Sequence, residues 1–459
     1  MRVGLGQQRV GEGQAHGAGA DDEVVGLDEI GTHAAPLSGT IKGEHMRSVR
    51  NPRGTGRARA RPAALGPGKV RRCESPTTAG NQAMSEHGQR LFIARAELSR
   101  AHVGADPDAP AQRLLKPGQA RLAVEAFSLT ANNITYAVFG EAMKYWQFFP
   151  AGDPALGCLP VWGFATVTES QTDGVVEGRR VWGYYPAGTH LVVAPSKVSN
   201  TGFVDGAEHR RELAGVYNQY GFCDADPGWK PELEGLQAVL RPLFMTAFLI
   251  DDFLSDNEFF GARQVLLSSA SSKTAQGTAY CLARRRGMPG APRIVGLTSA
   301  AHVEFVRSLG CYDAVLTYDQ LDTLEAQTPT VYVDFAGDAE LRRRIHTHFA
   351  DALKFSSSVG GSHWSALGSA HDLPGPRPVL FFAPAQVKAR SAPPPQGWGA
   401  AELQRRMGQA WAEFIDQVNS RDWLRIVMRT GPQAALHAYG DMLAGRAEAR
   451  EGLMLDMRG

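Results

Sequence analysis

The chain has 459 residues, of which 43% are hydrophobic and 21% are charged, enough for two globular domains and a tail. A net charge of +1 disfavours nucleic acid or an anionic membrane as a partner. The five cysteines form no CxxC pair, which argues against a zinc ribbon or a disulfide framework. The most apolar stretch, 238–254, contains Arg241, Pro242 and two aspartates, so we expect no membrane helix and a soluble, cytoplasmic protein.

Residues 1–83 are rich in Gly, Ala and Arg and lack aromatic side chains, which predicts a disordered leader. The leader has no apolar signal-peptide core, and the early acids Asp21-Asp22-Glu23 argue against a transit peptide. It is either a basic arm that touches phosphates or sequence upstream of a natural start at Met84. Because globular patterning begins at Leu91, the second interpretation is favoured.

The remaining chain divides into three segments. Residues 84–235 contain short alternating runs, at 120–126, 161–169 and 181–185 among others, separated by Pro-Gly turns; this pattern is typical of a β-rich domain. Residues 236–380 alternate apolar runs with helical stretches, which predicts a parallel sheet. Residues 381–459 begin with a strand-like run and a proline-rich loop. Amphipathic helices follow at 400–420 and 432–444, and we expect this segment to complete the substrate domain and the joint.

One unit carries the clearest functional signal. A buried strand at 265–267 is followed by the small-residue turn 268–275, a helix to Arg286 and a second strand at 293–297. This order is a βαβ unit, whose first turn is the usual seat of a dinucleotide pyrophosphate. The glycines expected in that turn are missing.

The order of these pieces resembles the medium-chain dehydrogenase/reductase superfamily, in its zinc-free quinone-reductase and enoyl-reductase branch. The resemblance covers about residues 91–456, and the most similar group is a bacterial and fungal family of unknown function. It is carried by segments 124–133, 159–167, 178–183, 305–313, 331–337 and 355–361. It implies an α/β protein in which a GroES-like β-rich domain packs on a Rossmann-like, doubly wound parallel sheet, with NADPH and a small-molecule substrate between them.

The resemblance places the three cofactor glycines on Ser269, Ser272 and Ala275. Small hydroxyls at a helix N-terminus can donate to phosphate, and a lysine adds a cation. Thr298 and Ser299 put no acid where NAD-preferring enzymes bind the ribose, which favours NADPH. His302 or one of residues 284–286 would neutralise the 2′-phosphate. The expected cofactor-binding residues are Ser269, Ser271, Ser272, Lys273, Thr274, Ala275, Thr298, Ser299, His302, Gly360 and Gly361.

A metal is not expected, because Gly163-Phe164-Ala165 stands where the zinc enzymes carry Gly-His-Glu, and no cysteine lies in 128–133. The proton donor is expected to be Tyr136 or Tyr145, with Asn132 or Asn133 as an orienting amide. Alternatively, the tyrosines only wall an apolar pocket. Residues 217–220 either line the cleft or pack the domain joint, and His363 is a further candidate.

The sequence therefore predicts a zinc-independent, NADPH-dependent oxidoreductase acting on a small carbonyl, quinone or enoyl compound, with no nucleic-acid or membrane partner. The resemblance leaves a homodimer through an edge at 379–382 open. The alternative is a catalytically inactive nucleotide-sensing or partner-binding protein on the same scaffold.

Overall fold

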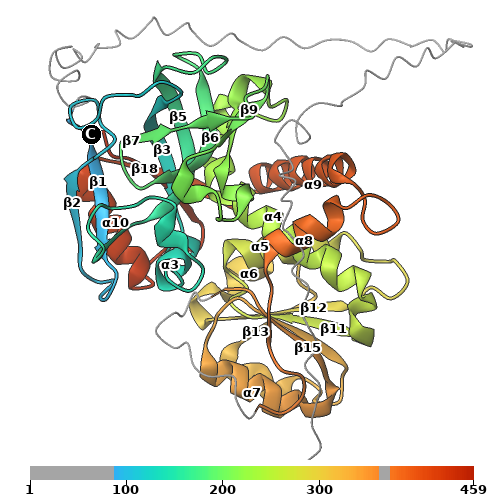
Figure 1. Cartoon of the computed structure of the whole chain (residues 1–459). Coiled ribbons are helices and arrows are strands. Elements are labelled where there is room, and N and C mark those ends of the chain that lie inside the picture. The colour runs from blue at the N-terminus through green and yellow to red at the C-terminus, as the bar shows by residue number, and fades with distance from the viewer. Residues whose placement is uncertain (1–86, 361–372, 459) are drawn as a thin grey trace, which may run out of the picture.

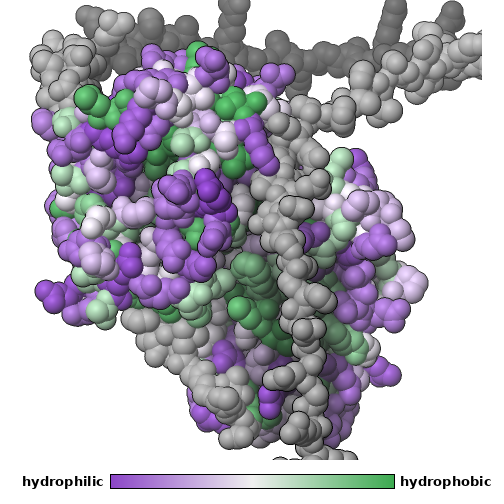
Figure 2. All heavy atoms as spheres, in the orientation of Figure 1, coloured by the Kyte–Doolittle hydropathy of each residue, from purple (hydrophilic) through white to green (hydrophobic). Residues whose placement is uncertain are grey.

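A computed structural model describes residues 87–360 and 373–458. Figure 1 shows two lobes, each built around a large sheet, with the C-terminus in the lobe that contains the first strands of the chain. In Figure 2, polar side chains cover much of the outer surface of the lobes, and apolar atoms lie in the hollow between them.

The first lobe is β-rich. A nine-stranded sheet has the order β17-β18-β3-β5-β6-β10-β9-β8, with β7 also paired to β3, and a smaller sheet has the order β2-β1-β4. The strands are β1 (Gln89–Ala94), β2 (Ala101–Ala105), β3 (Ala120–Leu129), β4 (Leu156–Cys158), β5 (Pro160–Ser170), β6 (Arg180–Pro186), β7 (His190–Val193), β8 (Pro195–Ser196), β9 (Gly202–Asp205), β10 (Gln219–Phe222), β17 (Arg425–Thr430) and β18 (Glu451–Asp456). Helices α3 (Ala131–Val138) and α10 (Pro432–Leu443) pack beside these strands. Because β18 pairs with β3, the last strand of the chain completes a sheet that begins near residue 120.

The second lobe contains six parallel strands in the order β13-β12-β11-β14-β15-β16. Its elements are α4 (Glu234–Asp256), β11 (Gln264–Leu267), α5 (Lys273–Ala283), β12 (Arg293–Thr298), α6 (Val303–Ser308), β13 (Ala314–Thr317), β14 (Thr330–Asp334), α7 (Ala339–Phe349), β15 (Leu353–Ser358) and β16 (Val379–Leu380). Strand order reverses between β11 and β14, so the sheet is doubly wound as predicted. In such sheets ligands bind beyond the carboxyl ends of the strands, at the point of reversal.

Helix α4 ties the lobes together. Ser128 Oγ of β3 donates to Ala238 O at 2.8 Å, and Arg180 Nη2 of β6 donates to Glu234 Oε2 at 2.6 Å. By length and composition alone, Pro231–Asp256 could cross a membrane. Its apolar face instead packs against β3, β5, β18 and α5, as expected for the core helix of a folded domain.

Helices α8 (Ala383–Ser391) and α9 (Ala400–Ser420) follow the second sheet and pack on α4. The bounds of α9 agree with the predicted helix at 400–420. Its buried residues Leu403, Met407, Ala410, Phe414 and Val418 recur every three or four positions, which places them on one face. That face packs against α4 and α5.

Candidate functional site

The turn after β11 is tied to the neighbouring strand β14. Ser268 Oγ donates to Asp334 Oδ1 at 2.9 Å and accepts the backbone N–H groups of Phe335 and Ala336 at 3.0 and 3.1 Å. Arg342 of α7 donates two hydrogen bonds to the other carboxylate oxygen of Asp334. The reversal point of the sheet is therefore held by a buried polar network.

The structural roles of the missing glycines are filled in other ways. Ser269 itself adopts φ +48°, in the left-handed region that favours glycine. Ala275 is fully buried. Gly277, two residues later, permits close packing of the helices, because a Cβ there would lie 2.9 Å from the Cβ of Ala247 on α4.

Helix α5 begins with a capped turn and a cation. Ser272 is the N-cap, and its Oγ accepts the Ala275 N–H at 3.4 Å. Lys273 and Thr274, the first two helical residues, are half-buried. In the described part of the chain no hydrogen bond or ion pair holds the Lys273 ammonium, and burial lowers its pKa to about 8. The negative charge of Glu451 on β18, in the other lobe, acts in the opposite direction and raises the pKa of Lys273.

Four of the predicted cofactor residues meet at the end of β12. Ser271 Oγ and Ser299 Oγ each lie 3.2 Å from His302 Nδ1, and Thr298 Oγ1 donates to Ser271 Oγ at 3.5 Å. His302 ends the short helix η7 (Ala300–His302). None of these four side chains is acidic, so the cluster can accept a phosphate without charge repulsion.

The other predicted cations lie elsewhere. Residues 284–286 follow the far end of α5, about 16 Å along the helix from the turn. Arg284 pairs with Glu413, Arg285 with Asp251 and Arg286 with Asp313. The expectation that one of them lies across the turn is therefore wrong, because the helix carries them toward the amino ends of the strands.

Gly360 lies at the carboxyl ends of β14 and β15. Its N–H donates to Asp334 O at 3.2 Å, and a Cβ at this position would lie 3.0 Å from Phe335 O. Glycine therefore allows a close approach of the two strand ends. Gly361 and His363 lie outside the described residues.

The predicted tyrosines belong to an aromatic cluster on the β-rich lobe. The rings of Tyr136 and Tyr145 lie 4.5 Å apart, and the hydroxyls of Tyr145 and Tyr217 lie 3.4 Å apart. Trp162 Nε1 donates to the Tyr136 hydroxyl at 3.4 Å, and the Tyr184 ring lies 4.7 Å from the half-buried Tyr217 ring. Burial raises the pKa of Tyr136 and of Tyr145, so both phenols keep their protons at neutral pH.

The two asparagines differ in their surroundings. Asn133 Oδ1 accepts the Thr130 N–H at 2.7 Å and its Nδ2 donates to Pro160 O at 2.8 Å, so its amide caps α3 and binds β5. Asn132 is half-buried, and its side chain lies near enough to the Tyr136 phenol to lower the pKa that burial raises. Of the two, Asn132 is the one beside the phenols.

Phe164 occupies the place expected of a zinc-binding histidine. It is fully buried against α4, and its ring lies 4.9 Å from that of Trp182. Within residues 87–360 and 373–458, no group of three or more His, Cys, Asp or Glu side chains has the arrangement of a metal site.

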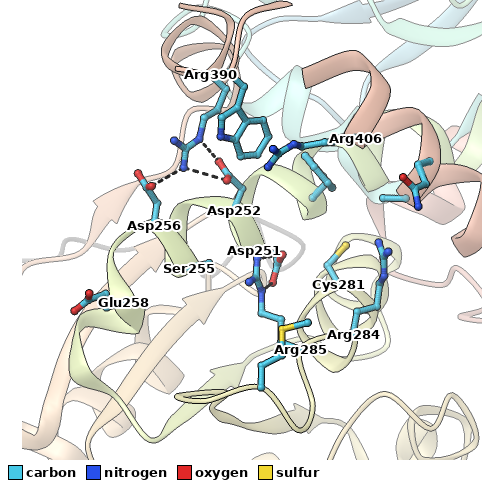
Figure 3. Close-up of a pocket in the computed structure, with 15 residues that line it drawn as sticks. Asp251, Asp252, Ser255, Asp256, Glu258, Cys281, Arg284, Arg285, Arg390 and Arg406 are labelled. Carbon is cyan, nitrogen blue, oxygen red and sulfur yellow. Dashed lines mark hydrogen bonds and ion pairs between the residues drawn. The ribbon is translucent and has the colours of Figure 1, made fainter. Parts of the chain in front are cut away.

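A cavity of about 610 Å³ lies between α4, α5, α8 and α9, close to the amino ends of the strands (Figure 3). Arg390 bridges Asp252 and Asp256 on one wall, and Arg285 binds Asp251 with two hydrogen bonds. Ion pairs thus already satisfy much of the charge of this cavity. Because it lies away from the carboxyl ends of the strands, it is separate from the turn site.

Sequence reasoning missed two side chains at the turn. Tyr318, directly after β13, hydrogen-bonds Ser269, and burial raises its pKa to about 12. Asp334 is the last residue of the buried strand β14, and its position at a strand end is the signal that could have identified it.

The β-rich lobe and the doubly wound parallel sheet together define the fold of the medium-chain dehydrogenases and reductases, as predicted. CurA from Vibrio vulnificus in complex with NADPH shares 12% identity and a TM-score of 0.50 over 80% of this chain and 99% of that chain. A second structure of CurA from the same organism shares 12% identity and a TM-score of 0.50, over 81% of this chain and 98% of that chain. The yhdH oxidoreductase of Salmonella enterica in complex with NADP shares 12% identity and a TM-score of 0.43, over 80% of this chain and 99% of that chain.

Within this fold, the chain belongs to a family described as protein of unknown function (DUF2855), whose model matches residues 127–448. No curated protein matches the sequence. The matched region includes the turn site, the aromatic cluster and α9.

Proposed function

We propose that this protein is a cytoplasmic, NADPH-dependent oxidoreductase that reduces a small carbonyl, quinone or enoyl compound without zinc. The observation that carries the proposal is the half-buried Lys273 cation at the start of α5, which no described side chain pairs directly. A helix N-terminus attracts phosphate through its free N–H groups and its dipole, and a lysine strengthens that attraction. CurA, which has a similar fold, was solved in complex with NADPH.

Three side chains are suited to the ribose 2′-phosphate. Ser271, Ser299 and His302 meet beside the turn and carry no negative charge. Two hydroxyls and an imidazole can donate to phosphate oxygens, whereas the carboxylate typical of NAD-preferring sites would repel them. This set of donors supports NADPH rather than NADH.

When bound, the reduced nicotinamide supplies a hydride to the substrate. The protein must then supply a proton to the oxygen or carbon that becomes negative. The phenols of Tyr136 and Tyr145 are protonated at neutral pH, and in this proposal one of them donates that proton, with Asn132 orienting Tyr136. Burial raises the pKa of both phenols, so the donor must be held against the developing negative charge. Gly360 lets its own backbone lie close to that of Phe335, so the ends of β14 and β15 approach each other closely.

The chemistry of the side chains supports zinc independence. A phenyl ring cannot ligate zinc, and Phe164 stands where the zinc enzymes have histidine. Its neighbours on the same sheet face are Trp162 and Trp182, whose rings stack 5.6 Å apart. Without a Lewis acid, polarisation of the substrate would depend on phenol and amide donors.

A second candidate function is nucleotide sensing without chemistry. It is favoured by the burial of Tyr136 and Tyr145, each less than 10% exposed within a cluster of rings. Calorimetric titration with NADPH and NADH tests both candidates. No heat with either at high micromolar concentration would exclude both. Binding followed by NADPH oxidation with a member of a quinone and enone panel supports the enzyme, whereas binding without turnover supports the sensor.

We also propose that a second copy of the chain pairs with β16. Val379, Leu380 and Phe382 are 50%, 58% and 40% exposed at this edge of the sheet, and an exposed apolar edge strand readily pairs with another chain. Light scattering should give the mass of a dimer for the full chain and of a monomer for Leu380→Lys. A wild-type protein that is monomeric at micromolar concentration would exclude this pairing.

A further inference from the structure

The glycine-poor turn has a conformation that its own residues do not favour. Ser269 adopts φ +48°. This left-handed conformation is less favourable in free energy for any residue with a Cβ than for glycine. Neighbouring groups must therefore compensate for the conformation. Asp334 fixes Ser268 on one side of the turn, and the other side leads into helix α5.

Tyr312 reaches that side from the loop between α6 and β13. Its hydroxyl donates to Ala270 O at 2.9 Å and lies 3.3 Å from Ala275 O. Ala270 belongs to the turn and Ala275 to the first turn of α5. One hydroxyl therefore joins the turn to the beginning of the helix.

A glycine in β12 makes room for this side chain. A Cβ at Gly296 would lie 2.8 Å from both Cδ1 and Cε1 of Tyr312 and 2.9 Å from the Cβ of Ala270. The Tyr312 ring and the turn therefore both pack onto the backbone of β12. Burial raises the pKa of Tyr312 well above its usual value, so the hydroxyl keeps the proton that it donates.

We propose that Tyr312 is a positioning residue, which holds the glycine-poor turn and the start of α5 in the geometry that a dinucleotide pyrophosphate requires. This inference rests on the proposed function. The first N–H groups of a helix have no intrahelical acceptor and are the groups that bind phosphate. Here they belong to Lys273 and its neighbours, so movement of Ala270 or Ala275 would displace both the N–H groups and the lysine.

The test compares Tyr312→Phe with a matched control. The variant keeps the ring and removes only the hydroxyl, and the NADPH dissociation constant should rise about 3- to 10-fold, as expected for one lost hydrogen bond. In the free protein, hydrogen–deuterium exchange of the amides between Ser268 and Ala275 should become faster. Tyr280→Phe removes a phenol hydroxyl from a buried residue further along the same helix, and should change neither quantity.

A rescue experiment separates positioning from general stability. Glycine adopts φ +48° without strain, so adding Ser269→Gly to Tyr312→Phe should slow the exchange of the backbone amides of the turn relative to Tyr312→Phe alone. If Tyr312→Phe acted only through overall stability, exchange would become faster throughout the chain and not mainly between Ser268 and Ala275. Gly296→Ala, which pushes against the same ring, provides an independent variant with the same expected weakening if Tyr312→Phe does not fold.

The outcomes are distinguishable. If the wild-type protein does not bind NADPH, the proposed function is wrong, whereas exchange at the turn still reports whether Tyr312 holds it. If the wild-type protein binds NADPH and Tyr312→Phe retains both its affinity and its exchange rates, the positioning role is wrong.

Discussion

The affinity of this protein for NADPH should fall above neutral pH, and Lys273 should be the cause. Burial lowers the pKa of its ammonium to about 8 in the free protein. A pyrophosphate stays fully ionised over this range and favours the charged lysine, so the pKa in the complex should return toward its usual value of about 10.4. Binding should therefore take up a proton between about pH 8 and pH 10.

The size of the effect follows from the fraction of charged lysine. With a pKa of about 8, roughly half of the free molecules carry the charge at pH 8 and roughly one in ten at pH 9. The affinity should therefore be nearly constant below pH 7, about twofold weaker at pH 8 and about tenfold weaker at pH 9. Calorimetry in two buffers that differ in ionisation enthalpy measures both the dissociation constant and the proton uptake.

Lys273→Met is the control for this prediction. It should weaken binding at pH 7 by about 10- to 100-fold, the range for a lost charge-assisted contact, and give a flat profile up to pH 9. A wild-type affinity that is independent of pH from 7 to 9.5 would refute the reasoning. An equal slope in the variant would assign the titration to another group.

The same lysine should reduce the stability of the free protein. Its folded pKa lies below the unfolded value, so the unfolded chain binds more protons between about pH 8 and pH 10, and stability should rise with pH across that window. Lys273→Met should therefore raise the melting temperature of the free protein at pH 7. After allowance for partial exposure, the expected gain is on the order of 2 kcal/mol. A lower melting temperature in the variant would mean that the lysine makes a stabilising contact.

Three further predictions concern the surroundings of the site. His302→Ala should weaken NADPH binding about 5- to 20-fold and leave NADH within about twofold; equal losses for the two would show that the imidazole does not contact the 2′-phosphate. Arg342→Met leaves the buried Asp334 carboxylate without its cation and should cost about 3–5 kcal/mol in urea unfolding, whereas Arg343→Met on the exposed side of α7 should cost less than about 1 kcal/mol. Burial lowers the pKa of His346, so the unfolded state binds more protons and stability should fall as pH drops below about 6.5; a melting temperature equal at pH 7.5 and pH 5.5 contradicts this.

The parts of the fold that depend on local pattern could be predicted from the sequence. The period of apolar residues indicated α9, and the order of strand, turn, helix and strand indicated the unit around β11 and β12. The carboxyl ends of parallel strands lie at one edge, which also brings Ser271 and His302 together across 31 residues. These conclusions need only periodicity and the known geometry of a βαβ unit.

Contacts that depend on which side chain crosses to a distant element could not be predicted. The Tyr312 hydroxyl reaches Ala270 across 42 residues, and Ser268 binds Asp334 across 66. The arginines at 284–286 follow the helix that begins at the turn, and the length of α5 carries them to the opposite end of the sheet. The number of residues in a helix determines how far apart its two ends lie. Which side chains contact those ends depends on the paths of the neighbouring loops, which the sequence pattern does not give.

The absence of glycines from the turn therefore does not mean that the turn geometry is absent. Ser269 adopts the left-handed conformation, and Gly277 permits the close approach of α4 and α5. Gly296 leaves space for the Tyr312 ring, whose hydroxyl donates to Ala270 O in the turn. Each requirement is a need for space or for a backbone angle, and either can be met at a nearby position. It follows that this turn geometry does not require the glycine motif in the sequence.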